Sequence, residues 1–369
     1  MMCKGFRTTA TSAAIILAGI PPLYLRAEQE ATITRVLQLR KDATFHDTTH
    51  SPTLYENPRP TQRPHPGIQG RNFRITIDNT SNSSIPNATY VYYTDGSKIE
   101  DGVGSAYICY HQNDEHTSWK AALRHFNSVF QQAEALAILN ATNDILSNGY
   151  HQACICTDSQ SSLLAIQNLS HTSPIISEIQ KLLSVNHQQR IHLTWVKAHA
   201  GLVGNEAADT LAKEAAAISS EVQQIRIRAP PSHLKRLLKE DLLKIWQEEW
   251  NACDTGRRTY NLLPKVSLSR LIAIPQLTRF ITGHGPYPAY YYRHNISTTD
   301  ACVCGANQLG SPDHYIYSCP LTADNHIKHP TPPTDAFQRF IIKNKPAINK
   351  ICKVIDQLAA MGQDICDAA

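Results

Sequence analysis

Hydrophobic and polar positions follow two periods in the middle of the chain. Short apolar runs rich in β-branched and aromatic residues predict five strands, at 88–94, 103–111, 117–123, 153–157 and 190–197. Apolar positions at helical spacing predict four helices, at 128–146, 159–169, 174–186 and 206–218. The order β-β-β-α-β-α-α-β-α predicts an α/β fold, with a mixed five-stranded sheet flanked by helices.

The segments on either side have different patterns. Residues 1–40 predict one or two helices around a break at Pro21-Pro22. Residues 41–86 are rich in Pro, Ser and Asn, which indicates a linker. Residues 221–369 are mainly helical, including an amphipathic helix over 233–250. We therefore expect four parts, with a central domain at 87–220.

Charge is distributed unevenly over these parts. Residues 87–220 contain 7 basic and 12 acidic side chains, a net charge of −5. The preceding 86 residues have a net charge of +4, from 10 basic and 6 acidic side chains, and residues 221–369 have +5, from 18 and 13. An acidic domain either binds cations or approaches an anion with the help of basic flanks.

The N-terminus resembles a secretion signal only superficially. Lys4 and Arg7 precede an apolar run, but Gly19, Pro21 and Pro22 interrupt it and no good cleavage site follows. No apolar stretch is long enough to predict a transmembrane helix, so no membrane partner is expected. These features favour an intracellular protein, nuclear or cytoplasmic, over a secreted one.

Four acidic residues of the central domain are candidates for metal binding. Asp95 and Asp158 end two predicted strands, which would bring both carboxylates to one edge of the sheet. Glu134 and Asp209 lie on helices, on faces that also carry alanines. Converging carboxylates repel one another unless cations are present, and their hard oxygens suit two Mg²⁺ or Mn²⁺ ions. Two such ions form a clamp for in-line displacement at a phosphodiester.

The motifs around these acids resemble the type 1 ribonuclease H family over about 87–218. The matching segments are Tyr-Thr-Asp-Gly-Ser at 93–97, Gln-Ala-Glu-Ala at 132–135, Thr-Asp-Ser-Gln at 157–160, Val-Lys-Ala-His-Ala-Gly at 196–201 and Gly-Asn-Glu-Ala-Ala-Asp at 204–209. Several separated motifs in the expected order are far more specific than one Asp-Gly-Ser alone. The resemblance implies a ribonuclease H-like fold and endonucleolytic cleavage of the RNA strand of RNA–DNA hybrids.

The resemblance also implies a role for each residue. Asp95 would bridge two metal ions, and Glu134 and Asp158 would each complete the coordination of one. Asp209 would bind the ion that activates water. His199, on the loop before the last helix, would shuttle a proton or help the product leave. Ala198 departs from relatives that carry Gly or Ser there, which would alter the flexibility of the loop but removes no ligand.

A second group of candidate ligands lies in the C-terminal part. Cys302, Cys304, His314 and Cys319 offer three thiolates and one imidazole, a set that suits a structural Zn²⁺. Three unrelated cysteines and a chance histidine are the alternative. The surrounding sequence resembles the tail of arthropod-type non-LTR retrotransposon polyproteins, and residues 6–23 resemble the end of their reverse transcriptase region. The chain is thus expected to be a C-terminal fragment of such a polyprotein.

Two alternatives to an active ribonuclease H stay open at this point. One is a catalytically idle, retroelement-derived protein that binds single-stranded or other nucleic acid through its zinc module and basic tail. The other is a transposase-type nuclease on the same fold, which would require Glu rather than Asp209 on the last helix.

Overall fold

The protein, described by a computed structural model, forms two compact units. The structure describes residues 3–57, 73–77, 87–100, 102–185, 188–217 and 222–363. One unit comprises Glu30–Leu238, and the other combines Met1–Gln29 with Lys239–Ala369. Parts of the predicted linker, 58–72 and 78–86, lie outside the described residues. Among the described helices, none has the length and apolar content needed to cross a bilayer.

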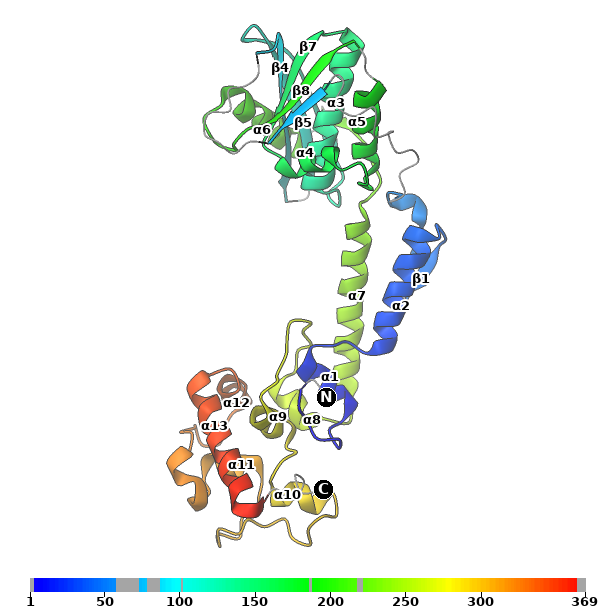
Figure 1. The fold of residues 1–369 in the computed structure, drawn as a ribbon. Coiled ribbons are helices and arrows are strands. Elements are labelled where there is room, and N and C mark those ends of the chain that lie inside the picture. The colour runs from blue at the N-terminus through cyan, green and yellow to red at the C-terminus, as the bar shows by residue number, and fades with distance from the viewer. Residues whose placement is uncertain are drawn as a thin grey trace. The chain divides into compact units, whose positions relative to one another are not determined.

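A mixed sheet of seven strands forms the centre of the first unit (Figure 1). In spatial order its strands are β3 (Phe73–Thr76), β8 (Arg190–Trp195), β7 (Gln152–Thr157), β4 (Tyr90–Ile99), β5 (Gly102–His111), β6 (Asp114–Leu123) and β9 (Gln223–Gln224). β4, β5 and β6 are antiparallel neighbours, and every other pairing is parallel. The predicted α/β class is confirmed, and its five strands are all present.

The two additional strands come from outside the predicted domain. β3 belongs to the segment expected to be a linker, and it pairs with β8 at one edge of the sheet. β9 follows the last helix of the domain and pairs with β6 at the other edge. Both strands are short. β9 consists of two glutamines, whereas around β3 apolar and polar residues alternate over only five positions, 73–77, inside a segment rich in Pro, Ser and Asn. The same segment also contains a hairpin of β1 (Ala43–Phe45) and β2 (Thr48–His50).

Helices pack on both faces of the sheet (Figure 1). They are α3 (Glu134–Asn148), α4 (Gln160–Gln167), α5 (Pro174–Val185) and α6 (Val203–Ala216). Tyr92 and Tyr107 point from the strands into a core with apolar residues of α3 and α5. On the opposite face α6 lies so close to β5 that a Cβ on Gly104 would stand 2.0 Å from the Ala212 carbonyl oxygen. Glycine is required at that position because no side chain fits.

One boundary differs from the prediction in a way that matters for the site. The first strand was predicted over 88–94, with Asp95 at its end, but β4 continues through Asp95, Gly96 and Ser97 to Ile99. β5 pairs with β4 along its whole length, whereas the pairing of β4 with β7 stops at Thr94. Asp95 is therefore the first β4 residue beyond the parallel pairing, although the strand does not end there.

The second unit is mainly helical. It includes α1 (Thr11–Ala18), α8 (Arg257–Leu262), α9 (Pro275–Thr282), α10 (Pro288–Arg293), α11 (Pro312–Tyr317), α12 (Asp335–Ile341) and α13 (Lys345–Leu358). α2 (Leu23–Ile33) and α7 (Pro231–Ala252) each contain a boundary between the units. The N-terminal segment packs within this unit, since Thr278 Oγ1 donates a 2.8 Å hydrogen bond to the Cys3 carbonyl. Most of the N-terminal part predicted at 1–40 and most of the C-terminal part predicted at 221–369 thus belong to one compact unit.

Candidate functional site

Three of the four predicted acids meet at one point. One carboxylate oxygen from each of Asp95, Glu134 and Asp158 lies within 4.8 Å of the other two. The first stands on β4, the second is the first residue of α3, and the third follows the last residue of β7. Asp95 and Glu134 are only 7% and 5% exposed. The sheet and one helix end therefore hold three acids in a largely dry space.

A close approach between β4 and α3 makes this convergence possible. A Cβ on Gly96 would lie 2.7 Å from the backbone nitrogen of Glu134 and 3.0 Å from the Ala133 Cβ. The turn before α3 is a π-helix over Val129–Ala133, and Ser105 Oγ donates a 2.7 Å hydrogen bond to the Ala133 carbonyl. The glycine of the Asp-Gly-Ser motif thus has a steric role, because it lets the helix begin against the strand.

The three carboxyls hold their protons more tightly than ordinary acids. Burial, together with the charges of Asp158 and Asp209, raises the pKa of Asp95 to about 7. Burial and the charges of Asp95 and Asp158 raise the pKa of Glu134 well above its usual value. Burial also raises the pKa of Asp158, while a hydrogen bond from Asn205 and the nearby His199 oppose that rise. Without a compensating positive charge, this group resists full ionisation.

Asp209 lies beside this group and is not part of the close triad. Its carboxylate accepts a 2.7 Å hydrogen bond from Lys213 Nζ, one turn further along α6. Its charge nevertheless raises the pKa values of both Asp95 and Asp158. The structure therefore places all four predicted acids in one electrostatic neighbourhood, with the fourth paired to a lysine.

His199 stands on the exposed loop between β8 and α6. Its φ of 52° is in the left-handed region, and Gly201 two residues later has a φ of 76°. The imidazole is close enough to Asp158 to oppose the rise in that carboxyl's pKa. His199 thus lies on a loop before α6, as predicted, and it stands near Asp158.

Asn205 also belongs to the site, although the sequence had suggested no role for it. Its side-chain nitrogen donates a 3.5 Å hydrogen bond to Asp158 Oδ2, and the residue is only 4% exposed. The only sign in the sequence was its place inside the motif at 204–209. An amide there orients Asp158 without adding charge.

The donor set fits divalent cations of the Mg²⁺ and Mn²⁺ class. Glu134 Oε2 and Asn205 Oδ1 are buried, and neither has a hydrogen-bond partner among the described residues. Buried oxygens without partners are costly, and a bound cation would satisfy them. The three clustered carboxylates, whose pKa values are raised, also favour a cation, because its positive charge would compensate their mutual repulsion.

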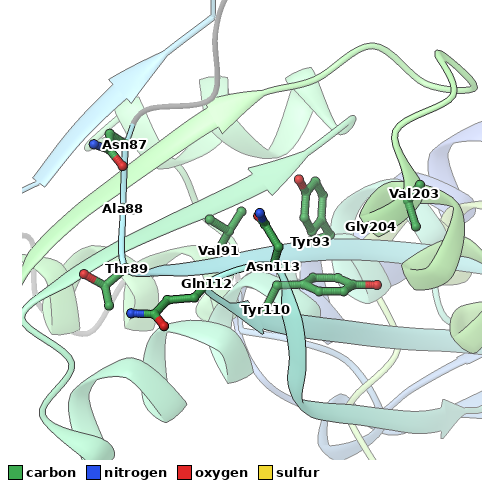
Figure 2. Close-up of a pocket in the computed structure, with 10 residues that line it drawn as sticks. All are labelled: Asn87, Ala88, Thr89, Val91, Tyr93, Tyr110, Gln112, Asn113, Val203 and Gly204. Carbon is green, nitrogen blue, oxygen red and sulfur yellow. The ribbon is translucent and has the colours of Figure 1, made fainter.

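An uncharged groove is lined by residues of β4, β5 and the start of α6, among others (Figure 2). Its volume is about 520 Å³, and its lining includes Tyr93, Tyr110, Val203 and Gly204. Gly204 packs against the Tyr93 ring, which a Cβ would approach to 2.2 Å. None of the lining residues is acidic, so the groove is chemically distinct from the carboxylate group.

Comparison with known proteins identifies the domain that contains these acids. The RNase H family model matches residues 87–217. These residues form an RNase H domain. The matched range contains all four acids, and the family to which the match belongs is one of nucleases.

Curated proteins similar to this chain include retroelement proteins, in agreement with the sequence resemblance. A Pol polyprotein from type-1 retrotransposable element R1 of Bradysia coprophila is 33% identical over 97 residues, which are 25% of this chain and 10% of that protein. One from Nasonia vitripennis is 30% identical over 79 residues, 20% and 21% of the two chains. One from Popillia japonica is 23% identical over 188 residues, 51% and 74%. The chain thus covers only a small part of the first two relatives.

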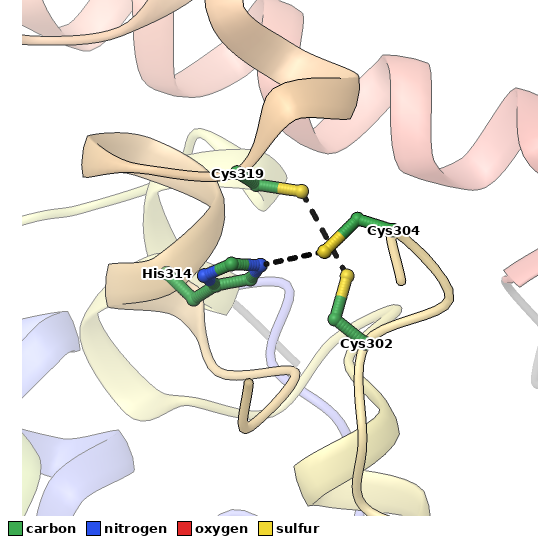
Figure 3. A group of neighbouring side chains, drawn as sticks. All are labelled: Cys302, Cys304, His314 and Cys319. Atoms are coloured by element: carbon green, nitrogen blue, oxygen red, sulfur yellow. Dashed lines mark hydrogen bonds between the residues drawn. The ribbon is translucent and has the colours of Figure 1, made fainter. Parts of the chain in front are cut away.

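The four predicted zinc ligands also meet in space, in the second unit (Figure 3). The sulfurs of Cys302 and Cys319 are 3.7 Å apart, and Cys304 Sγ is 3.5 Å from His314 Nε2. Tetrahedral ligands at zinc–sulfur and zinc–nitrogen bond lengths stand about 3.8 Å apart for two sulfurs and about 3.5 Å for sulfur and nitrogen. The observed spacings match that geometry.

Local hydrogen bonds orient this group. Ser311 caps the start of α11 by accepting from the His314 backbone N–H, and His314 Nδ1 lies 3.2 Å from Ser318 Oγ, which leaves Nε2 facing the sulfurs. The Ala306 N–H lowers the pKa of the Cys304 thiol, whereas burial raises that of Cys319 to about 12. Every described cysteine is a free thiol, so no disulfide competes for these sulfurs.

Proposed function

We propose that the RNase H domain hydrolyses the RNA strand of RNA–DNA hybrids with two divalent cations. The observation that carries the proposal is the convergence of Asp95, Glu134 and Asp158 within 4.8 Å, with raised pKa values. The family's activity and the retroelement relatives support the same substrate. Cleavage is endonucleolytic and leaves 5′-phosphate and 3′-hydroxyl ends.

The electrostatic contacts suggest how the acids share the work. Asp95 interacts with each of the other three carboxyls, so it is the residue that would bridge two cations. Glu134 and Asp158 would complete one ion each, and Asp209 would join the second after its carboxylate leaves Lys213. When bound, such cations neutralise the charge that develops on the phosphodiester and activate water.

The remaining site residues have supporting roles. Asn205 fixes the orientation of Asp158 by its amide hydrogen bond. His199 shuttles a proton or helps the product leave at the exposed rim of the acid group. Selection of RNA depends on the 2′-hydroxyl that only the cleaved strand carries.

A strand-specific cleavage assay tests this proposal. We expect the full chain with Mg²⁺ to cut the labelled RNA strand of a hybrid, and to leave double-stranded RNA, double-stranded DNA and the hybrid's DNA strand intact. Asp95→Asn should abolish cleavage while the protein stays folded. Cleavage that persists in Asp95→Asn, or a wild-type protein that never cuts hybrid, would favour the idle nucleic-acid-binding alternative. The transposase alternative predicts DNA cleavage instead.

We further propose that Cys302, Cys304, His314 and Cys319 hold one structural Zn²⁺. The spacings of the four ligand atoms support it, and all four positions are occupied by protein ligands, as in structural rather than catalytic zinc sites. Purified protein should contain about one zinc per chain, and Cys319→Ser should lose it. A zinc content that Cys319→Ser leaves unchanged would contradict the site.

A further inference from the structure

A basic groove lies outside the carboxylate group, at the junction of three segments of the first unit. Its volume is about 360 Å³. Its lining residues come from 53–55, from the loop after β6 and from the segment between β9 and α7; they are Thr53, Leu54, Tyr55, Arg124, Phe126, Arg226, Ile227, Arg228, Ala229 and His233. Three of these are arginines and none is acidic.

The guanidinium groups face outward because of the backbone pattern. Exposure alternates along residues 225–228, so successive side chains face opposite sides. Ile225 and Ile227 pack inward on the domain core, and Arg226 and Arg228 are exposed. These two arginines and Arg124 form no ion pair with an acidic residue in the described part of the chain. Their charge is therefore available to a ligand.

Hydrogen bonds hold the walls of the groove together. The Ala229 N–H donates to the Leu54 carbonyl at 2.8 Å, and the Glu56 N–H donates to the Ala229 carbonyl at 2.9 Å. Gln132 Nε2 donates to the Arg228 carbonyl at 2.9 Å. The buried Glu56 carboxyl accepts a hydrogen bond from Gln132 Nε2, and burial raises its pKa. The walls of the groove are thus built into the fold, and none of its lining residues is acidic.

Aromatic rings form the floor of the groove. Phe126 stacks on His233 with ring centroids 5.0 Å apart, and Tyr55 lies 6.4 Å from the same imidazole. The Arg124 guanidinium lies 5.7 Å from the Phe126 ring centre. Guanidinium groups above aromatic rings are the combination by which proteins hold a polynucleotide strand, through phosphates on one side and sugar or base faces on the other.

The position of the groove connects it to the acid group. Phe126 precedes Glu134 by only eight residues, and Lys98, three residues after Asp95 on β4, donates to the His125 carbonyl at 2.9 Å. The domain at 87–220 carries a net charge of −5, so it needs positive charge from elsewhere to attract a polyanion. Arg226 and Arg228, from beyond that range, supply it.

We propose that this groove binds the phosphate backbone of a nucleic-acid strand running beside the acid group. The nucleic acid is taken from the proposed function, but the binding does not depend on cleavage. Arg124, Arg226 and Arg228 contact phosphates, and Phe126 contacts a sugar or base. The sequence segments that flank the nuclease domain thereby form part of its substrate surface.

Salt-dependent binding by a non-cleaving protein tests the proposal. In full-length Asp95→Asn, fluorescence anisotropy measures the affinity for a labelled RNA–DNA hybrid between 50 and 200 mM salt. Each lost phosphate contact lowers the slope of log K against log salt by about 0.9. Arg226→Gln with Arg228→Gln should therefore lower the slope by about 1.8. When salt rises fourfold, from 50 to 200 mM, the protein with both arginines should therefore weaken by a factor about twelvefold larger than the factor for the double variant.

A matched control separates the groove from diffuse attraction. Lys181→Gln with Arg190→Gln removes the same charge from exposed positions of the same unit and should leave the slope nearly unchanged. An equal fall in both double variants, or no fall in either, would overturn the proposal. Binding of polyglutamate in place of the hybrid, with the same dependence on Arg226 and Arg228, would also overturn it. Because Asp95→Asn cannot report on catalysis, failure of the proposed function leaves this result intact.

Discussion

The raised pKa of Asp95 predicts a specific dependence of stability on pH. The ordinary value of 3.8 rises to about 7 in the folded protein. Between these values the folded state keeps a proton that the unfolded state has released, so stability falls as pH increases. At about 1.4 kcal/mol per pKa unit, a rise from 3.8 to about 7 lowers the free energy of unfolding by about 4 kcal/mol by pH 8. Glu134 and Asp158 act in the same direction.

Substitution of Asp95 by Asn should remove much of this dependence. The amide keeps the shape of the carboxyl but cannot ionise, and it also relieves the repulsion on Glu134. In a metal chelator, hydrogen exchange of the β4 and β7 amides, corrected for intrinsic rates, reports the local free energy of opening within the full chain. We expect that free energy to fall with pH in wild type and to fall by less than half as much in Asp95→Asn. Mg²⁺ should restore the wild type at pH 8 and restore the variant less.

Parallel pH profiles of the two proteins in chelator would refute the reasoning. They would mean that Asp95 titrates normally and that the acid group is not under electrostatic strain. A wild type that becomes more stable from pH 5 to pH 8 would also refute it, because the sign would be opposite.

Three further predictions address packing, charge and zinc. Gly96→Ala should cost at least about 2 kcal/mol of unfolding free energy, measured by urea denaturation, because its Cβ would stand 2.7 Å from a backbone nitrogen of α3; unchanged stability would contradict the close approach. Lys213→Gln, by freeing Asp209, should strengthen Mg²⁺ binding several-fold in calorimetry, whereas the control Lys120→Gln, which breaks another ion pair of α6, should not. Chelating zinc should lower the melting temperature of wild type but not of Cys319→Ser, and equal shifts in both would argue against the site.

The sequence predicted most of the sheet because its central strands are strongly apolar. β5 and β7 are almost entirely buried, so their sequences form continuous apolar runs that are easy to recognise. β3 and β9 could not be found in this way. They are short edge strands that pair with β8 and β6. The alternation at 73–77 is brief and lies in a polar, proline-rich segment, and β9 has no apolar residue at all.

The four acids were recognisable because separated motifs occur together in order, but their geometry was not. The i, i+4 spacing of Asp209 and Lys213 allows an ion pair on the helix, but it does not show that Asp209 forms this pair instead of joining the close triad. Similarly, Asn205 is one polar residue among several until the fold buries its amide against Asp158. The basic groove draws arginines from segments about a hundred residues apart, so only the folded chain reveals it.

Direct measurement of cation binding tests the central claim most sharply. Electron paramagnetic resonance of Mn²⁺ added to the full chain counts bound ions without requiring catalysis. We predict Mn²⁺ binding that Asp95→Asn and Glu134→Gln each weaken strongly and that Cys319→Ser leaves unchanged. Equal Mn²⁺ binding by wild type and the two carboxylate variants would contradict the claim that these acids form one metal site.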